Sequence, residues 1–516
     1  MRLVPLLFFL ALRAPDTYVV TGTVVDHLQN RPLNYILVTL TSTQDRKLTV
    51  STITAADGRF GFNNVPAGKY SLSAQRRGNS QLQLYRHDDQ YSTAIAVGPG
   101  LAAENIVFPL EAPGSISGTV LDQNSEPVQD AAIWLFRQVV SGGRSEIQML
   151  ADHRGDNAGA FHAGHLGPGT YFVAVTARPW YARGFPKMAS QPNPELDTAY
   201  PVTYYGDTTD PASASPIHLA EGGSASIQIN LRAVPAVHVD LNGSANLANP
   251  MVEALGGNTI PANATILGIN GRQEVAGLAP GRYIFRTMAG DDRRGRFGPG
   301  ARIDIAGNTT IASEDLKSTS LSGQVTFEGG VPEQLFLEFV CGNNRFIGRV
   351  VKDGSFRATG QPLEGGHCEV GLENAAGFYV KSIAVRGAKP SADAVDILEG
   401  ADNRLVVVVA KGAMSALEGF TVRDDKPFSS AMVLLLPEDL ARASWIRRDQ
   451  SDSDGSFALT NVLPGRYTLL AIEDGKELAY RDPAVIQPYL AQGVAVEFPR
   501  RDNSPVKINA IARRAN

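Results

Sequence analysis

The chain has 516 residues, more than one hydrophobic core can organise, so its length predicts several domains. Apolar residues make up 43% of it and charged residues 19%, which excludes wholesale disorder, and 51 Gly with 31 Pro favour turns and strands over long helices. A net charge of −5 with both signs interspersed gives no reason to expect nucleic acid as a partner.

The chain begins MRLVPLLFFLALRAPD, in which Arg2 precedes an apolar run from Leu3 to Leu12. A run this short cannot span a bilayer and is typical of a secretory signal, although a buried first strand is the alternative. We therefore expect residues 1–16 to be a signal peptide and the protein to be extracytoplasmic, either periplasmic or secreted. Since no Cys follows the run and no later stretch is apolar enough, neither a lipid anchor nor a transmembrane segment is expected.

A first motif recurs along the chain as a short alternating segment around a glycine. It is followed each time by a proline and then by an apolar run such as YILVTL or AMVLLL. The four clear copies are VTGTVVD, ISGTVLD, LSGQVTF and LEGFTVRD, around Gly22, Gly118, Gly323 and Gly419. The nearest match between the second and third copies is VHVDLNG, at 237–243. These glycines mark units of about a hundred residues, an ordinary size for one β-domain.

A second motif, Asp-Gly-x-Phe and then Gly-x-Tyr, follows the first in each unit. The stretches ITAADGRFGFNNVPAGKYSL and SDSDGSFALTNVLPGRYTLL are two copies of it. Its aromatic positions are Phe60, Phe161, Phe356 and Phe457, and Tyr70, Tyr171, Tyr283 and Tyr467. The third unit has Gln273 in place of Phe, and the fourth has Cys368 in place of Tyr.

The second motif predicts a hairpin and then a second turn. Asp-Gly and Asn-Gly supply the positive φ of a tight turn, and alternate residues of the strand that begins at Phe face inward. After the Pro-Gly turn, Tyr buries its ring while its hydroxyl reaches a backbone partner nearby. Both aromatic residues are therefore predicted to belong to the core. Few helices are expected; 437–445 is a candidate for a turn or two.

These two motifs together resemble the regulatory-like domain that follows the catalytic domain in some metallocarboxypeptidases. The resemblance implies an all-β fold, a tandem array of about five transthyretin-like (prealbumin-like, Ig-like) Greek-key β-sandwiches, similar also to Cna B-type and starch-binding-like modules. It implies a binding or scaffolding role and no peptidase activity. The predicted units are unit 1 (17–110), unit 2 (111–234, with an insertion at 179–215), unit 3 (235–314, divergent), unit 4 (315–410) and unit 5 (411–516).

Residues with catalytic or metal-binding chemistry are sparse. One H-x-x-E, at His218 and Glu221, lies between strand-like segments, with no catalytic-sized α/β domain around it. His162 and His165 would point to opposite faces of a strand, so they could not easily ligate one metal ion. The aspartates before Gly455, at 449, 452 and 454, lack the register of an EF-hand. We therefore expect no enzyme activity, no catalytic residue, no metal and no cofactor.

Two cysteines, Cys341 and Cys368, are the full complement of the chain. Their separation suits a disulfide within one small domain in an oxidising compartment. The alternative is two free buried thiols, and the sequence leaves both open.

The segment 179–215 is outside the repeat and is rich in proline and aromatic residues. Loops of this length are usually functional or cover a neighbouring unit. Its candidate ligand-binding residues are Trp180, Tyr181, Tyr200, Tyr204 and Tyr205, beside Phe185. The competing interpretation, which the frequency of buried aromatics favours, is that the rings pack over unit 2 or fill its joint with unit 3.

We therefore predict an exported, non-enzymatic protein that acts as a binding, adhesion or scaffold module of the cell envelope. One alternative is a carbohydrate-binding protein that uses the sandwich loops or the 179–215 segment, and another is an accessory subunit of a peptidase or an outer-membrane transporter. Polysaccharide and envelope proteins are the expected partners. The sequence does not define the ligand, the oligomeric state or the rigidity of the array.

Overall fold

The computed structural model describes residues 16–514 except 78–81, 89–90, 102, 183–194, 243–249, 257, 270–271, 289–296, 313–318, 343, 360–364, 374, 376 and 503. Residues 1–15 of the predicted signal peptide lie outside the described residues. The predicted all-β sandwich fold is confirmed, since strands dominate every unit and α1 (Pro483–Leu490) is the one α-helix in the described part. No helix in that part is long and apolar enough to cross a membrane.

Unit 1 forms two main sheets, ordered β10-β1-β4 and β3-β2-β5-β6, with β9 also on β5. Its strands are β1 (Thr17–Asp26), β2 (Leu37–Ser42), β3 (Thr49–Ile53), β4 (Arg59–Pro66), β5 (Gly68–Gln75), β6 (Gln83–Leu84), β7 (His87–Asp88), β8 (Tyr91–Ser92), β9 (Ile95–Val97) and β10 (Ile106–Leu110).

Unit 2 repeats this arrangement, with sheets β14-β11-β19 and β13-β12-β15-β17 and with β18 on β15. Its elements are β11 (Gly114–Leu121), β12 (Ala132–Ser141), β13 (Arg144–Arg154), β14 (Ala160–Leu166), β15 (Gly169–Thr176), η1 (Trp180–Ala182), β16 (Thr198–Ala199), β17 (Thr203–Tyr204), η2 (Pro211–Ser213), β18 (Ile217–Leu219) and β19 (Ser224–Asn230).

Unit 3 has sheets β24-β25-β21-β28 and β23-β22-β26-β27. Its strands are β20 (Val234–Pro235), which pairs with β16 of unit 2, β21 (Val237–Asn242), β22 (Pro250–Gly256), β23 (Asn258–Pro261), β24 (Thr265–Ile269), β25 (Arg272–Leu278), β26 (Gly281–Met288), β27 (Phe297–Ile305) and β28 (Thr309–Ala312).

Unit 4 differs, because its strands form one continuous sheet, β34-β36-β29-β32-β31-β30-β33-β35, in which β31 pairs with both β30 and β32. Its strands are β29 (Ser320–Glu328), β30 (Phe336–Cys341), β31 (Asn344–Val350), β32 (Ser355–Thr359), β33 (Gly366–Glu373), β34 (Phe378–Val385), β35 (Ala394–Ile397) and β36 (Asp402–Lys411).

Unit 5 has sheets β38-β37-β41, with β44 on β37, and β40-β39-β42-β43. Besides α1 its elements are β37 (Ser415–Arg423), β38 (Lys426–Pro427), β39 (Met432–Pro437), η4 (Ala443–Trp445), β40 (Arg447–Gln450), β41 (Ser456–Val462), β42 (Gly465–Ile472), β43 (Val494–Phe498) and β44 (Val506–Asn509). The turn expected within 437–445 is the 3-10 helix η4, whereas α1 was not expected.

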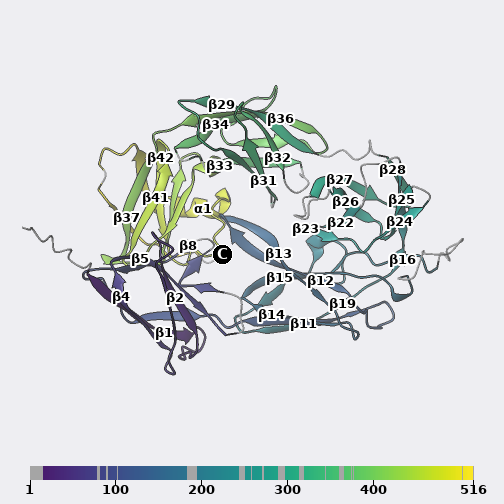
Figure 1. Cartoon of the computed structure of the whole chain (residues 1–516), viewed down its shortest axis with the longest axis horizontal. Helices are drawn as coiled ribbons and strands as arrows, with labels where there is room; N and C mark the ends of the chain where they lie inside the picture. Colours follow the sequence, from purple (N-terminus) through teal and green to yellow (C-terminus); the bar gives the residue numbers. More distant parts are fainter. Residues whose placement is uncertain are drawn as a thin grey trace, which may run out of the picture.

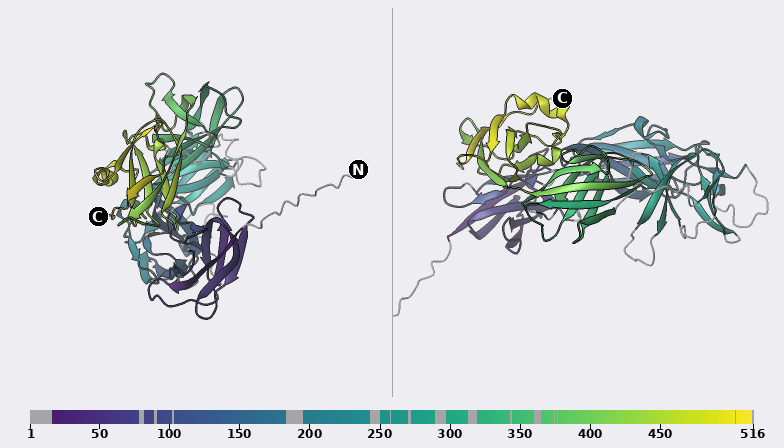
Figure 2. Two further views of the ribbon diagram at one scale, coloured as in Figure 1. Left: turned by 90° about the vertical axis from the view of Figure 1, so that its left-hand side faces the viewer. Right: turned by 90° about the horizontal axis from the view of Figure 1, so that it is seen from above.

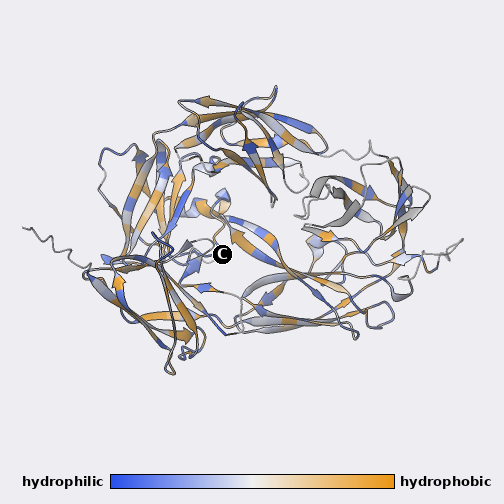
Figure 3. Ribbon diagram, in the orientation of Figure 1, coloured by the Kyte–Doolittle hydropathy of each residue, from blue (hydrophilic) through white to orange (hydrophobic). Residues whose placement is uncertain are grey.

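Buried apolar side chains form a separate cluster inside each unit. The alternation of apolar and polar residues along the strands, visible in Figure 3, places one face of each strand in these clusters. In unit 5 a second cluster covers the other face of β39 and β42, where Ile486 and Tyr489 of α1 pack on Leu434 and Leu470.

The recurring glycine and phenylalanine occupy one place in the sandwich. The strand that carries the glycine runs parallel to the last strand of its unit and antiparallel to the strand that carries Phe. A Cβ added to Gly22 would lie 2.5 Å from the Phe60 ring and 2.3 Å from the Ile106 carbonyl oxygen. Gly118, Gly323 and Gly419 meet Phe161, Phe356 and Phe457 in the same way. The glycine is needed because the Phe ring lies directly against the backbone.

The recurring tyrosine also has a common role. Its hydroxyl donates to the carbonyl oxygen four residues earlier, at 2.6–2.9 Å, in Tyr70, Tyr171, Tyr283 and Tyr467. Burial raises the pKa of Tyr467 to about 12, so the hydroxyl stays protonated as this donor role requires. This predicted core role of the tyrosine is present in every unit that carries it.

The predicted hairpin is wrong for units 1, 2 and 5. In unit 1, β3 and β4 flank Asp57-Gly58 but belong to different sheets, and β4 and β5 are again in different sheets. Gly58 has the expected positive φ of 75°. The turn therefore leads the chain from one sheet of the sandwich to the other, because the strand that carries the buried Phe pairs with the first strand of the unit. In units 3 and 4, β24 with β25 and β31 with β32 do form antiparallel pairs.

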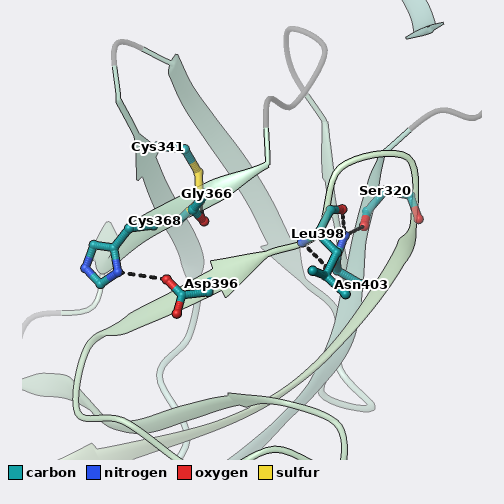
Figure 4. Close-up of a disulfide and its surroundings, with 8 residues drawn as sticks. Ser320, Cys341, Gly366, Cys368, Asp396, Leu398 and Asn403 are labelled. Atoms are coloured by element: carbon teal, nitrogen blue, oxygen red, sulfur yellow. Dashed lines mark hydrogen bonds and ion pairs between the residues drawn. A yellow bond between two sulfur atoms is a disulfide. The ribbon is translucent and has the colours of Figure 1, made fainter. Parts of the chain in front are cut away.

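In unit 4 a disulfide stands where the other units have tyrosine. Cys341 on β30 and Cys368 on β33 are directly opposite in the register and are joined by a disulfide, with their Cα atoms 4.2 Å apart (Figure 4). Near it, the buried Asn403 side chain donates to the Leu398 carbonyl and accepts from its amide, both at 2.9 Å (Figure 4). The disulfide and this amide together tie β30, β33 and the loop before β36.

The units follow a closed path rather than a line. Figure 1 shows unit 5 between units 4 and 1, so that the last unit meets the first, and Figure 2 gives two further views of this arrangement. Side chains link units 1 and 2, 2 and 3, 3 and 4, 4 and 5, and 5 and 1. The hairpin of β12 and β13 also reaches from unit 2 toward unit 5.

Candidate functional site

The aromatic segment 179–215 packs in part against the protein itself. Tyr200 belongs to the core of unit 2, and Tyr204 packs with Phe136 and with Ile260 of unit 3. Burial raises the pKa of both tyrosines to about 12. Their rings therefore fill a core and a joint between units and present no face to a ligand.

In the part of the segment that the structure describes, one large ring is exposed. Trp180 is 72% exposed and meets Tyr181 edge to face, with ring centroids 5.7 Å apart. Tyr181 accepts a hydrogen bond from Thr198, and Tyr205 is half-buried against the core of unit 2. Phe185 lies outside the described residues. A binding role for this segment stays a prediction that depends on Trp180.

His218 and Glu221 have separate partners. The His218 ring bonds the Thr170 hydroxyl at 3.2 Å, whereas Glu221 accepts from the Ala112 amide at 2.9 Å and pairs with His27 of unit 1 at 2.6 Å. Glu221 thus joins two units. Across the described part of the chain, no group of three or more His, Cys, Asp or Glu residues is placed to hold a metal ion.

The three aspartates before Gly455 also have separate partners, and one of them, Asp452, connects unit 5 to unit 1. Asp452 accepts from Lys69 of unit 1 at 2.6 Å and from the Ala94 amide at 3.0 Å. Burial raises the pKa of Asp452, although Lys69 opposes that shift. Asp449 instead accepts from the Ala458 amide, and Asp454 from Ser456.

Backbone and side chains continue this junction between units 1 and 5. The Ser453 amide donates to the Ala94 carbonyl at 2.9 Å, and the Ala96 amide donates to the Ser453 hydroxyl at 2.8 Å. Gln450 is buried and donates to Thr93 at 3.0 Å. The junction thus satisfies main-chain groups of β9 and of the β40–β41 turn at the same time.

A second junction joins units 2, 4 and 5. Glu369 on β33 pairs with Arg144 of unit 2 and, at 2.8 Å, with Arg481 of unit 5. Arg481 also donates to the Gly142 carbonyl at 2.8 Å. A Cβ on Gly143 would lie 2.4 Å from the Tyr480 ring, so the tip of the hairpin is fitted closely beneath unit 5.

Between units 4 and 5 lies a cleft of about 660 Å³. One wall is formed by β30, β33 and β34 of unit 4, and the other by η4, β40 and β41 of unit 5, with Tyr91 of unit 1 beside them. Tyr379 and Trp445, one from each wall, meet edge to face with centroids 6.4 Å apart. This volume is typical of a small-molecule site.

The charge of the cleft comes from Arg447, Arg448 and Arg481 against Glu338 and Glu369. Both glutamates are already in ion pairs, Glu338 with Arg345 and Glu369 with two arginines. Neither glutamate is therefore an ion-pair partner of Arg447.

Arg447 lines the cleft from β40. Its guanidinium donates to the carbonyl oxygens of Ser444, Ile446 and Asn461 at 2.8–2.9 Å. Among the described residues, no carboxylate lies within 4.0 Å of it. Burial lowers its pKa, and the neighbouring charge of Arg481 acts in the same direction. A half-buried cation whose acceptors in the described residues are carbonyl oxygens can receive an anion.

The comparisons with known proteins agree with the predicted family in unit 1. The family model for the carboxypeptidase regulatory-like domain matches residues 19–101. Unit 1 is therefore similar to a carboxypeptidase regulatory-like domain. The predicted resemblance is thus confirmed for this part of the chain, and the regulatory-like domain carries the Gly22–Phe60 contact and the Tyr70 hydrogen bond described above. A search of curated proteins finds no match.

Solved structures similar to the chain include bacterial pilins and one further bacterial protein. The minor pilin GBS52 of Streptococcus agalactiae is 15% identical, with 42% of this chain and 97% of that chain covered and a TM-score of 0.23. The shaft pilin SpaA of Lactobacillus rhamnosus GG is 10% identical, with coverages of 43% and 98% and a TM-score of 0.20. The Bacillus anthracis TIE protein is 11% identical, with coverages of 97% and 74% and a TM-score of 0.17. No functional conclusion follows from likeness at this level.

Sequence reasoning missed the junctions and the cleft. Lys69 is the variable residue of Gly-x-Tyr, and Glu369 and Arg447 belong to no motif. The ion-pair partners of Lys69 and Glu369 lie on other units. A local signal existed for one element: Asp482 followed by Pro483 is a typical helix start, and Asp482 does accept from the Ala484 amide at the N-terminus of α1.

Proposed function

We propose that the chain is an exported, non-enzymatic scaffold protein of the cell envelope, with five β-sandwich domains closed into one body. The observation that supports this most is the position of unit 5, which contacts units 1, 2 and 4 through paired charges and backbone hydrogen bonds. A string of flexible domains would not bury Gln450 and half-bury Asp452 against the first unit.

The disulfide supports export. Disulfides persist in oxidising compartments and are rare in the cytosol, so the Cys341–Cys368 bond fits a periplasmic or secreted protein. The similarity of unit 1 to a regulatory-like domain supports the non-enzymatic part of the proposal. Peptidase assays with and without zinc should show no turnover, and reproducible turnover would contradict this part of the proposal.

Closure can be tested by small-angle X-ray scattering of the full chain. A single compact body of this length has a radius of gyration of about 24 Å, and we expect a value at or slightly above it. Lys69→Glu places a second negative charge against Asp452 and should increase the radius. Lys47→Glu, an exposed lysine of the same unit, is the matched control and should leave it unchanged. A wild-type radius near double the compact value would contradict closure.

A further inference from the structure

The cleft between units 4 and 5 has the features of a ligand site that the scaffold role does not require. We propose that it binds an acidic oligosaccharide, with a sugar carboxylate placed against Arg447. The argument has three steps: the charge of the cleft, its size, and the chemistry of its walls.

Charge favours an anion. Arg447 is half-buried, lies beside Arg481, and in the described residues has carbonyl oxygens rather than a carboxylate as its acceptors. Three of its five N–H groups already donate to carbonyl oxygens, which leaves the Nη2 group to donate to a carboxylate. Because Glu369 and Glu338 are each held by an arginine, they do not neutralise Arg447. An incoming carboxylate would therefore remove the cost of burying this charge without a counter-ion.

Size excludes a simple ion as the intended ligand. A volume of about 660 Å³ is far larger than an inorganic anion needs and lies within the range of organic ligand sites. The cleft is also bounded by two separate units, so its width depends on the junction that Ser444 makes with Asp393. Such a site suits a ligand of a few rings.

The walls favour a sugar. Thr460 and Asn461 are exposed on β41 and offer hydroxyl and amide groups, and Glu338 of unit 4 also lines the cleft. Tyr379 and Trp445 add ring surface at the same cleft. Dense hydrogen-bonding groups beside aromatic rings suit a molecule with many hydroxyls and apolar ring faces.

The test is calorimetric titration of the full chain with three probes: trigalacturonate, the neutral trisaccharide maltotriose, and the peptide Ala-Ala-Ala with a free carboxylate. We expect trigalacturonate to bind and the other two to bind at least tenfold more weakly. Equal binding of maltotriose would overturn the role of the carboxylate. Preference for the peptide would overturn the sugar class, and no binding of trigalacturonate would overturn the proposal as a whole.

Variants locate the binding. Arg447→Gln should weaken the binding of trigalacturonate about tenfold to a hundredfold, as expected for the loss of hydrogen bonds to a charged group. Arg466→Gln, at an exposed arginine of the same unit, is the control and should leave binding unchanged.

A second variant tests the location without changing Arg447. Ala458→Trp fills the cleft from an exposed position and should abolish binding even if Arg447→Gln does not fold. Binding that survives Ala458→Trp, with an unchanged melting temperature, would place the ligand elsewhere. Scattering by these variants separates loss of the ligand from loss of closure.

Discussion

Units 5 and 3 share the strand order of one sheet, β40-β39-β42-β43 in unit 5 and β23-β22-β26-β27 in unit 3, but differ at the motif that defines the repeat. In unit 5, Gly419 lies against Phe457, so no side chain fits there. In unit 3 the corresponding partners in the register are Leu241 and Gln273, and Leu241 is buried in the core. Gly and Phe are thus replaced together because they share one space. Tyr283 is retained, because its hydrogen bond lies within its own turn and needs neither of them.

The largest expected effect comes from forcing the unit 3 arrangement on unit 5. Gly419→Leu should destabilise the protein by about 3 kcal/mol, since the new side chain meets the Phe457 ring and the Val506 carbonyl. Phe457→Ala should cost about as much by leaving a cavity. Combined, the two should cost clearly less than their sum, because Leu then occupies the space of the ring. Chemical denaturation of the three variants measures this coupling, and additive costs would refute the shared-space explanation.

The next effect separates unit 4 from the units that carry tyrosine. Replacing both Cys341 and Cys368 by Ser should cost about 3 kcal/mol, since the disulfide joins residues 27 apart. Under reducing conditions the wild type should lose a similar amount, and the double variant should not respond to the reductant. Thermal unfolding with and without dithiothreitol checks both statements. A wild type that is indifferent to the reductant would show that the disulfide carries no stability.

The smallest effect concerns the joint between units 2 and 3. His238 lies between Asp197, at 2.7 Å, and Glu274. Burial alone would lower its pKa, but the hydrogen bonds and charges of Glu274 and Asp197 outweigh burial and raise it above 6.5. A raised pKa in the folded state contributes stability that is full below pH 6.5 and is lost as the pH rises through the folded value.

We therefore expect wild-type stability to decline above pH 6.5 more than that of His238→Gln, which should cost about 1 kcal/mol at low pH. His153→Gln, in unit 2, serves as the control and should follow the wild-type profile. Melting temperatures between pH 5 and 9 provide the measurement. Parallel profiles for wild type and His238→Gln would show that the imidazolium does not stabilise this joint.

Part of the fold could be predicted because it depends on local spacing. The Asp-Gly turn and the Gly-x-Tyr step each have a short-range physical reason, and together with the recurring glycine they predicted the family of unit 1. The hairpin was wrong in three units because Asp-Gly specifies a turn but not which sheet the next strand joins. That choice depends on pairing between Phe60 and Gly22, which are far apart in the chain.

The candidate site was less predictable than the fold. The aromatic segment attracted notice through composition, yet Tyr204 packs against Ile260 of the next unit, a contact that composition cannot reveal. Arg447, in contrast, follows an unremarkable 3-10 turn. Its importance arises from burial between two units and from the absence of a carboxylate nearby in the described residues.

By itself the sequence determined the β-rich repeat, its aromatic core positions and the divergence of units 3 and 4, because alternation and turn chemistry act over a few residues. The closed path of the units, the Glu369 junction and the charged cleft were decided by tertiary structure. The physical reason is that these features pair groups from different units, such as Lys69 with Asp452, whose strength depends on proximity and burial rather than on neighbouring sequence.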